Sequence, residues 1–322
     1  MLELRRGTVR EADGEHLEVE LESGERAPAW HDPGLVGPCE PGDDVVVNVQ
    51  ARRLGLGSGG FDVVHCNLTR GLDASGDAEP HVMKLNYTSL QHAVAPVEGG
   101  VRAAVDGPVA VLALHGQLEP AAWAFARAAP GASLGYVQTA GGALPGAFSR
   151  VVRRLREEDL LAGHVTAGAA YGGEEEALTT IGALEHALGR WDAVVAGPGP
   201  GILGSASALG HGGMAALDTA HAALALGAPT LLVPRMSESD PRPRHRNVSH
   251  HTATVLDLVL APVTVALPAG RRALDDRHDW RAVDVDLSAY PQPLTTMGRE
   301  DPLFYAAAIA GGTQLAAMMA RR

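Results

Sequence analysis

Lysine and cysteine are scarce in this chain of 322 residues, and each scarcity excludes a class of site. Lys84 is the one lysine beside 25 arginines. No Lys-Ser or Lys-Thr pair follows a glycine loop, so a Walker-type phosphate loop is excluded, and a Schiff-base enzyme could use only Lys84. Cys39 and Cys66 are too few for a four-thiolate zinc site, an iron–sulfur cluster or a disulfide framework. This cysteine usage fits a reducing cytoplasm, which is the location that we expect.

The sequence also lacks the signals of membrane and nucleic-acid proteins. Residues 1–6 contain charged side chains and no apolar signal-peptide region, and apolar runs such as 222–234 are short and broken by Gly and Pro. Asp and Glu number 38 against 26 Lys and Arg, which gives a net charge of −12. A negative chain argues against nucleic acid and anionic membranes as partners. We expect instead a homo-oligomer that binds a small molecule.

Residues 1–70 predict a small β-barrel or sandwich domain. Short alternating runs separated by Gly and Asp turns occur at 7–10, 16–21, 44–49 and 61–64. This region holds seven Arg and thirteen acidic residues, whereas an oligonucleotide-binding barrel is more often basic. A lid, a spacer or a subunit contact is therefore the favoured role. Residues 71–107 are predicted to be a linker and connecting segment.

Residues 108–322 alternate short apolar strands with amphipathic helices. The strands are expected at 109–114, 133–138, 164–169, 193–196, 230–233 and 263–267, with a further candidate at 283–287. Leu178, Ile181, Leu184 and Leu188 mark one helical face, and the preceding Glu174-Glu-Glu176 suits the N-terminus of that helix. Asp301-Pro302 begins the last helix. The pattern predicts an α/β fold with a doubly wound, mostly parallel, Rossmann-like sheet covered on both faces. Ligands bind at the carboxyl ends of the strands in such sheets.

Two glycine-rich loops follow predicted strands. The first begins at Thr139, and its Gly141 and Gly142 either present backbone N–H groups to an anion or form a plain tight turn. The second contains the G-x-G-x-x-G spacing of a dinucleotide site, and its candidate ligand-binding residues are Gly199, Gly201, Gly204 and Ser205.

Two observations argue against ordinary NAD binding at the second loop. Pro198 and Pro200 cannot donate N–H bonds. The next strand ends at Arg235, where an NAD site needs an acidic residue for the ribose. Contact with an anion or a nucleotide remains the alternative to a structural loop.

The loop at 235–251 is the densest in chemistry, with four Arg, two acidic residues and three His. One interpretation is an anion clamp that uses Arg235, Ser237, Arg242 and Arg244. A second is a divalent-metal site, with Asp240, His245 and either His250 or His251 as ligands. The third is an exposed charged loop with internal salt bridges. Ser249 is expected to cap the following helix.

Four further features give weaker indications. Lys84 is by default a surface lysine on a connecting strand; the alternative is a position that needs a compact ammonium, which makes Lys84 a candidate ligand-binding residue. His115 at a strand end is expected to stabilise a loop, and His164 to lie at a strand start. The segment 295–301 is expected to be a capping loop.

Several segments together resemble the bacterial domain-of-unknown-function family 3866 over nearly the whole chain. They are Val82-Met-Lys-Leu-Asn-Tyr-Thr, Gly197-Pro-Gly, the run from Arg235 to His245, Ser249-His-His and Thr296-Met-Gly-Arg. The resemblance implies a bacterial protein that fits the cytoplasmic expectation. It implies no activity, substrate or catalytic residue.

The leading functional hypothesis is an enzyme or a binding protein for a phosphorylated or otherwise anionic small molecule at the carboxyl edge of the sheet. Asp240, His245, His250 and His251 are its candidate catalytic residues, because imidazole exchanges protons near neutral pH. The alternatives are a non-catalytic metabolite-sensing or assembly module and a divalent-metal-dependent hydrolase. Since no nucleophile-elbow motif is present, acyl transfer is not supported. No cofactor is specified, although a divalent metal remains one alternative.

Overall fold

The computed structural model describes residues 2–55, 59–72, 82–100 and 105–319, which fall into two compact units, Met1–Val94 and Ala95–Arg322. Part of the linker predicted at 71–107 lies outside the described residues. The described part of that linker in the first unit forms a hairpin of β6 (Val82–Lys84) and β7 (His92–Val94).

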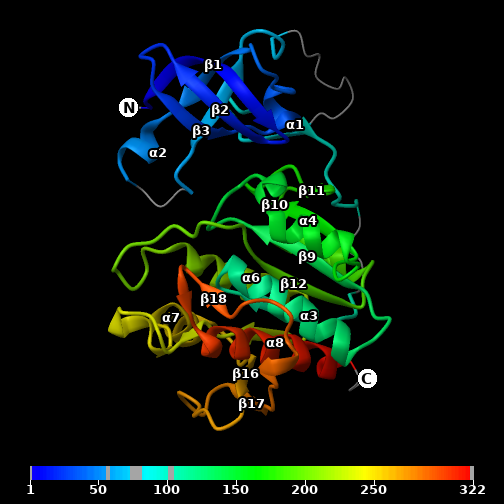
Figure 1. Ribbon diagram of the computed structural model, residues 1–322. Helices are drawn as coiled ribbons and strands as arrows, with labels where there is room; N and C mark the ends of the chain where they lie inside the picture. Colours follow the sequence, from blue (N-terminus) through cyan, green and yellow to red (C-terminus); the bar gives the residue numbers. More distant parts are fainter. Residues whose placement is uncertain (1, 56–58, 73–81, 101–104, 320–322) are drawn as a thin grey trace. The chain divides into compact units, whose positions relative to one another are not determined.

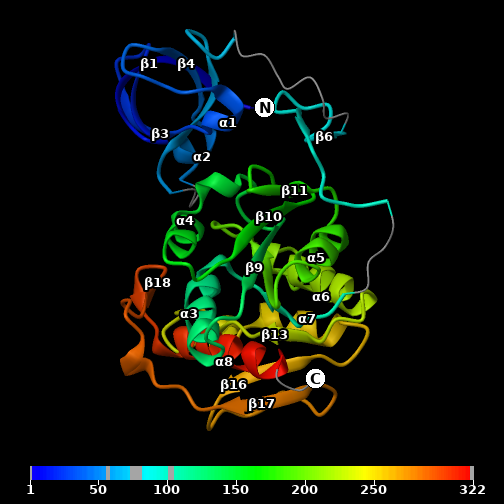
Figure 2. The ribbon, with the colours of Figure 1, turned by 90° about the vertical axis from the view of Figure 1, so that its right-hand side faces the viewer.

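The first unit contains a closed barrel of five strands, seen as a ring in Figure 2. The strands follow the order β1-β2-β3-β5-β4, and β3 pairs with β5 in parallel. Their bounds are β1 (Leu4–Asp13), β2 (His16–Leu21), β3 (Arg26–Trp30), β4 (Asp44–Asn48) and β5 (Asp62–Asn67), with short helices α1 (Pro33–Val36) and α2 (Gln50–Arg53). Alternating side chains such as Val45 and Val47 fill the barrel, which confirms the predicted β domain. Sequence reasoning missed β3, which contains Pro28 and no β-branched residue.

The second unit is built on a parallel sheet of eight strands in the order β11-β10-β9-β12-β8-β13-β16-β17. The strands are β8 (Val109–Leu112), β9 (Leu134–Thr139), β10 (Gly163–Ala167), β11 (Glu175–Ala177), β12 (Ala193–Pro198), β13 (Thr230–Val233), β16 (Thr264–Pro268) and β17 (Asp279–Val283). The central strands are apolar on both faces because helices cover both faces.

Helices lie on both faces of the sheet (Figures 1 and 2), and each face has its own hydrophobic core. One core includes Phe125, Leu155 and Leu315 from α3 (Leu118–Ala128), α4 (Arg150–Glu157) and α8 (Pro302–Met319). The other includes residues of α5 (Thr180–Leu188), α6 (Ala215–Ala225) and α7 (His250–Leu258). Two short hairpins complete the unit: β14 (Met236–Ser237) with β15 (Asn247–Val248), and β18 (Thr295–Thr296) with β19 (Arg299–Glu300).

The strand order places several loops together at the carboxyl edge. The chain proceeds from β8 through β9 and β10 to one side of the sheet, and then returns to β12 and continues to the other side. The loops after β8, β9, β12 and β13 therefore leave neighbouring strands at one edge. In a Rossmann sheet the first two strands are neighbours, whereas here β12 lies between β8 and β9.

Two local predictions in this unit were wrong, and a third was correct in part. Residues 174–176 were expected to begin a helix, yet Glu175–Ala177 is the strand β11, and Thr179 caps α5 instead. Of the predicted helical face, Leu184 and Leu188 are buried in α5, whereas Ile181 is about two-fifths exposed and Leu178 lies before the helix. The last strand lies at Asp279–Val283 rather than 283–287, because the edge strand β17 is more polar than the pattern used to find it.

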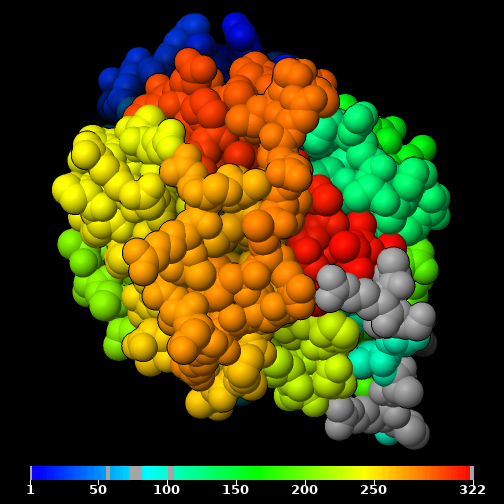
Figure 3. All heavy atoms as spheres, turned by 90° about the horizontal axis from the view of Figure 1, so that it is seen from below, coloured from blue at the N-terminus to red at the C-terminus, as the bar shows by residue number. Residues whose placement is uncertain are grey.

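Helix α8 is long and apolar enough to cross a membrane by length and composition, but 72% of it is buried inside the structure. Figure 3 shows only a small red part of α8 beside the orange segment that contains β17. A helix covered in this way fits the core helix of a globular unit.

Gly312 of α8 gives a test of this packing. A Cβ at Gly312 would overlap the carbonyl oxygen of Ala121 in α3. We expect Gly312→Ala to lower the free energy of unfolding by about 1–3 kcal/mol, as overpacking does. Gly189→Ala is the matched control, since its Cβ would meet nothing closer than 3.5 Å. Urea unfolding of both variants measures the difference, and equal stabilities would contradict the packing.

Candidate functional site

Asp240 is the centre of an arginine cluster at the carboxyl edge. Its carboxylate is fully buried and accepts hydrogen bonds from Arg242 at 2.8 and 2.9 Å and from Arg235 at 3.2 Å. Arg299, from β19, lies 3.5 Å away. The hydrogen bonds from Arg242 hold the pKa of Asp240 well below its usual range. Three guanidinium groups thus share one carboxylate.

Arg235 is the buried member of this cluster, with 3% of its surface exposed. Its backbone N–H donates to Thr252 Oγ1, and its Nη1 lies 3.3 Å from Nδ1 of His251. Burial lowers the pKa of Arg235 to about 10, so the guanidinium remains charged at neutral pH. Of the three arginines predicted to form the clamp, Arg242 and Arg244 are exposed to solvent and Arg235 is buried.

Ser237 and Asp301 fix the start of the arginine loop. The hydroxyl of Ser237 donates to Asp301 and accepts from the backbone N–H of Asp240 at 3.0 Å. The backbone N–H of Glu238 donates to Asp301 at 3.1 Å. Helix α8 begins at Pro302 as predicted, but the Asp301 carboxylate contacts this loop. The hydroxyl of Ser237, a predicted member of the anion clamp, is therefore already used in hydrogen bonds within the protein.

Four imidazoles lie together beside the arginines. His245 bonds to Ser249 at 2.8 Å, and Ser249 caps α7 as predicted by accepting from the N–H of His251. The ring centroids of His245 lie 4.9 Å from those of His250 and of His251. Burial lowers the pKa of His245 to about 3 and lowers those of the other three, so the rings are neutral at pH 7. The fourth is His211, which sequence reasoning missed.

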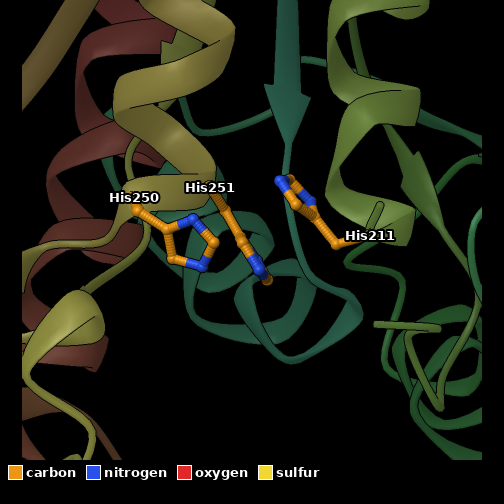
Figure 4. A group of neighbouring side chains, drawn as sticks. All are labelled: His211, His250 and His251. Atoms are coloured by element: carbon orange, nitrogen blue, oxygen red, sulfur yellow. The ribbon is translucent and has the colours of Figure 1, made fainter. Parts of the chain in front are cut away.

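His211, His250 and His251 place their ring nitrogens within 4.8 Å of one another. Figure 4 shows His250 and His251 at the start of α7, with His211 approaching from the chain before α6. The metal interpretation used Asp240 and His245, yet Asp240 is bonded to arginines and His245 to Ser249. Among the described residues, the group able to hold a metal ion is this trio instead.

Three glycines of the two predicted binding loops, Gly141, Gly142 and Gly199, serve close packing of the backbone. A Cβ on Gly142 would overlap the carbonyl oxygen of Gly199, and one on Gly141 would overlap that of Gly212. The N–H of Ala143 donates to the carbonyl of Pro200 at 2.6 Å. These three glycines therefore have a structural cause, whatever the loops bind.

The other predicted ligand-binding residues lie in different settings. Gly201, Gly204 and Ser205 are exposed, and the Ser205 hydroxyl donates to the carbonyl of Gly210 at 2.8 Å. Thr139 is buried at the end of β9. Lys84 belongs to the first unit and is 3% exposed, so the expectation of a surface lysine was wrong.

His115 has the loop-stabilising position that the sequence predicts. Its Nε2 lies 2.7 Å from Ser149 Oγ, and its Nδ1 lies 3.2 Å from the carbonyl oxygen of Pro198. It thereby joins the loops after β8, β9 and β12. His164 lies at the start of β10, as expected, and its ring stacks on that of Tyr136 with 5.1 Å between the ring centroids.

A surface hollow of about 580 Å³ lies at the opposite, amino edge of the sheet. Its lining includes Gly131, Trp191 and Asp192, which precede β9 and β12, and it contains no histidine. We place the candidate site at the carboxyl edge because the buried charges and imidazoles gather there.

Comparison with known proteins places the chain in a family. The model of the family described as "Protein of unknown function (DUF3866)" matches residues 28–312. The chain belongs to DUF3866. The motif resemblance is therefore confirmed, and membership of this uncharacterised family supplies no activity for the site.

Other comparisons add little to the family assignment. No curated protein matches the chain. A solved structure, "Crystal structure of YjeQ from Thermotoga maritima", is 12% identical and aligns with 80% of this chain and 66% of its own, with a TM-score of 0.17. A TM-score this low supports no inference about fold or function.

Proposed function

We propose that this protein binds a small anion of the phosphate or carboxylate class at the carboxyl edge of its parallel sheet. The observation that supports this function is the convergence of Arg235, Arg242 and Arg299 on the single carboxylate of Asp240. The loop 235–251 and the charged side chains that contact it hold six guanidinium groups and three carboxylates, a formal surplus of three positive charges: Arg235, Arg242, Arg244, Arg246, Arg271 and Arg299 against Glu238, Asp240 and Asp301. An anion would balance that surplus.

The exposure of the arginines assigns them different roles. The side chains of Arg242 and Arg299 are 44% and 31% exposed, so both can add a bond to an anion while they contact Asp240. Arg235 lies beneath them and positions Asp240. His250 is the cluster imidazole that is only half-buried, so when no metal is bound it is the member best able to exchange a proton with a bound molecule.

The proposed use of the edge follows the rule for doubly wound sheets, in which the reversal of strand order opens a crevice for ligands. We regard the sheet as a Rossmann-like variant with β12 inserted. A metabolite sensor without turnover would use the same residues. The half-buried imidazole beside the arginines favours chemistry, and turnover assays on the identified ligand decide between the two.

A thermal-shift panel of phosphate, sulfate, carboxylates, nucleotides and sugar phosphates tests the proposal. Saturation to about 100 times Kd stabilises a protein by about 2.7 kcal/mol, which raises Tm by several degrees. The Arg242→Gln/Arg299→Gln variant should lose that shift. Arg281→Gln, which removes an exposed partner of Asp279, should keep it. If no anion raises Tm more than chloride does at equal ionic strength, the proposal is wrong.

A further inference from the structure

We propose that His211, His250 and His251 bind one divalent transition-metal ion of the zinc class. The three imidazoles come from two segments, the chain before α6 and the first turn of α7, and meet within 4.8 Å (Figure 4). Imidazole suits zinc, copper, nickel and cobalt, whereas magnesium and calcium prefer oxygen ligands. This site goes beyond the anion site and does not depend on it.

Two of the ring nitrogens are buried and lack a hydrogen-bond partner. His211 is 6% exposed, and its Nε2 lies 2.9 Å from the carbonyl oxygen of Ala208. A carbonyl only accepts, so Nε2 carries the proton, and the lone pair of His211 is on Nδ1. Within the trio, Nδ1 of His211 and Nε2 of His250 are the two buried nitrogens that have no hydrogen-bond partner. Leaving a buried polar atom without a partner is destabilising, and a metal ion would satisfy both nitrogens.

The contact between His211 and Ala208 also matches the surroundings of a metal ligand. Metal-bound histidines usually donate their second ring N–H to a carbonyl or carboxylate, which fixes the ring and its tautomer. Ser249 performs a related task for the other two ligands, because its hydroxyl caps the helix turn that carries His250 and His251. The ring of His211 is therefore fixed by Ala208, and the cap by Ser249 fixes the backbone turn that carries His250 and His251.

Metal binding requires a small contraction of the trio. Zinc–nitrogen bonds of about 2.0–2.1 Å place tetrahedral ligand atoms about 3.4 Å apart. The rings of His211 and His251 stack at 3.7 Å with an angle of 15°, so one of them must turn to aim its lone pair at the ion. Gly213 leaves room for this movement, since a Cβ there would lie 3.0 Å from His211 Nδ1 and 3.4 Å from His251 Nδ1.

The neighbouring charges predict how the metal and the anion would interact. Nη1 of Arg235 lies 3.3 Å from Nδ1 of His251, and because a guanidinium only donates, a metal ion at that nitrogen must displace this hydrogen bond. Arg235 also repels a cation, although Asp240 offsets part of its charge. Three histidine ligands leave a fourth coordination position open to water or an anion. An anion between the metal and the arginines would lower the repulsion, so each ligand should raise the affinity of the other.

Zinc titration of tag-free, chelator-treated protein tests the site, with a chromophoric chelator as competitor. We expect one equivalent of zinc, and visible absorption typical of tetrahedral coordination when cobalt replaces it. His211→Ala and His250→Ala should each weaken binding at least 100-fold. His186→Gln, which removes an imidazole of α5 outside the trio, should bind as the unmodified protein does.

Gly213→Ala keeps all three ligands and crowds His211 and His251, so it should also weaken zinc binding and guards against a ligand variant that fails to fold. Absence of zinc binding, or equal zinc affinity in His250→Ala, would overturn the proposal. The Arg242→Gln/Arg299→Gln variant should retain zinc. Anion titrations of the metal-free protein are separate, so failure of one site is distinguishable from failure of the other.

Discussion

Asp240→Asn is expected to lower the free energy of unfolding by about 3–5 kcal/mol, the usual cost of breaking a buried ion pair. The amide keeps the shape of the carboxyl group but removes its charge. Arg235, which is buried and charged at neutral pH, is then left without an opposing charge. Arg242 and Arg299 also lose their shared partner, so three guanidinium groups repel one another in one place.

Urea unfolding at pH 7 measures this loss. The matched control is Asp279→Asn, whose partner Arg281 and own side chain are both exposed, and whose pair should contribute only about 0–1 kcal/mol. If Asp240→Asn proves no more destabilising than the control, Asp240 does not hold the arginine cluster together.

Acid should destabilise the protein well above the pH at which exposed carboxylates titrate. Burial lowers the pKa of His115 and of His164 from 6.5 to about 4. A lowered pKa means that the unfolded state takes up protons first. The stability from these neutral rings is complete above about pH 6.5 and declines as the pH falls toward 4.

The two rings should each cost about 2 kcal/mol of stability between pH 7 and pH 5, or about 4 kcal/mol together. His245 acts in the same direction, since burial lowers its pKa to about 3. Urea unfolding at pH 7, 6 and 5 checks the slope, and His164→Gln should reduce it because the amide does not titrate. A stability that stays constant within about 1 kcal/mol over this range would show that the rings are not buried as neutral groups.

Strand and helix positions in the second unit could largely be predicted, because short apolar strands and amphipathic helices have distinct periods. The predicted strand Thr230–Val233 has the observed bounds, and Ser249 and Pro302 mark helix starts correctly. The order of the strands could not be predicted. The insertion of β12 between β8 and β9 depends on packing between distant segments, which no local pattern records.

The candidate site shows the same limit. The loop 235–251 was identified by its composition, and the structure gathers its arginines and histidines at the carboxyl edge. His211 and Arg299 enter the cluster from distant segments, and only the three-dimensional fold brings them there. The one local signal for His211 was its position directly before Gly212 and Gly213, in the segment that leads to α6. The glycine pattern at 199–204 resembled a nucleotide-binding motif in the sequence, but in the structure Gly199 is needed for close packing against the neighbouring loop.

Calorimetric titration of the metal-free, tag-free protein with inorganic phosphate, or with the anion of the panel that raises Tm most, is the decisive test of anion binding at the arginine cluster. We expect saturable binding of one anion, with an affinity that weakens with added salt, falls at least tenfold in Arg242→Gln/Arg299→Gln and is unchanged in Arg281→Gln. Binding of equal strength in all three proteins, or no saturable binding to the unmodified protein, would contradict it.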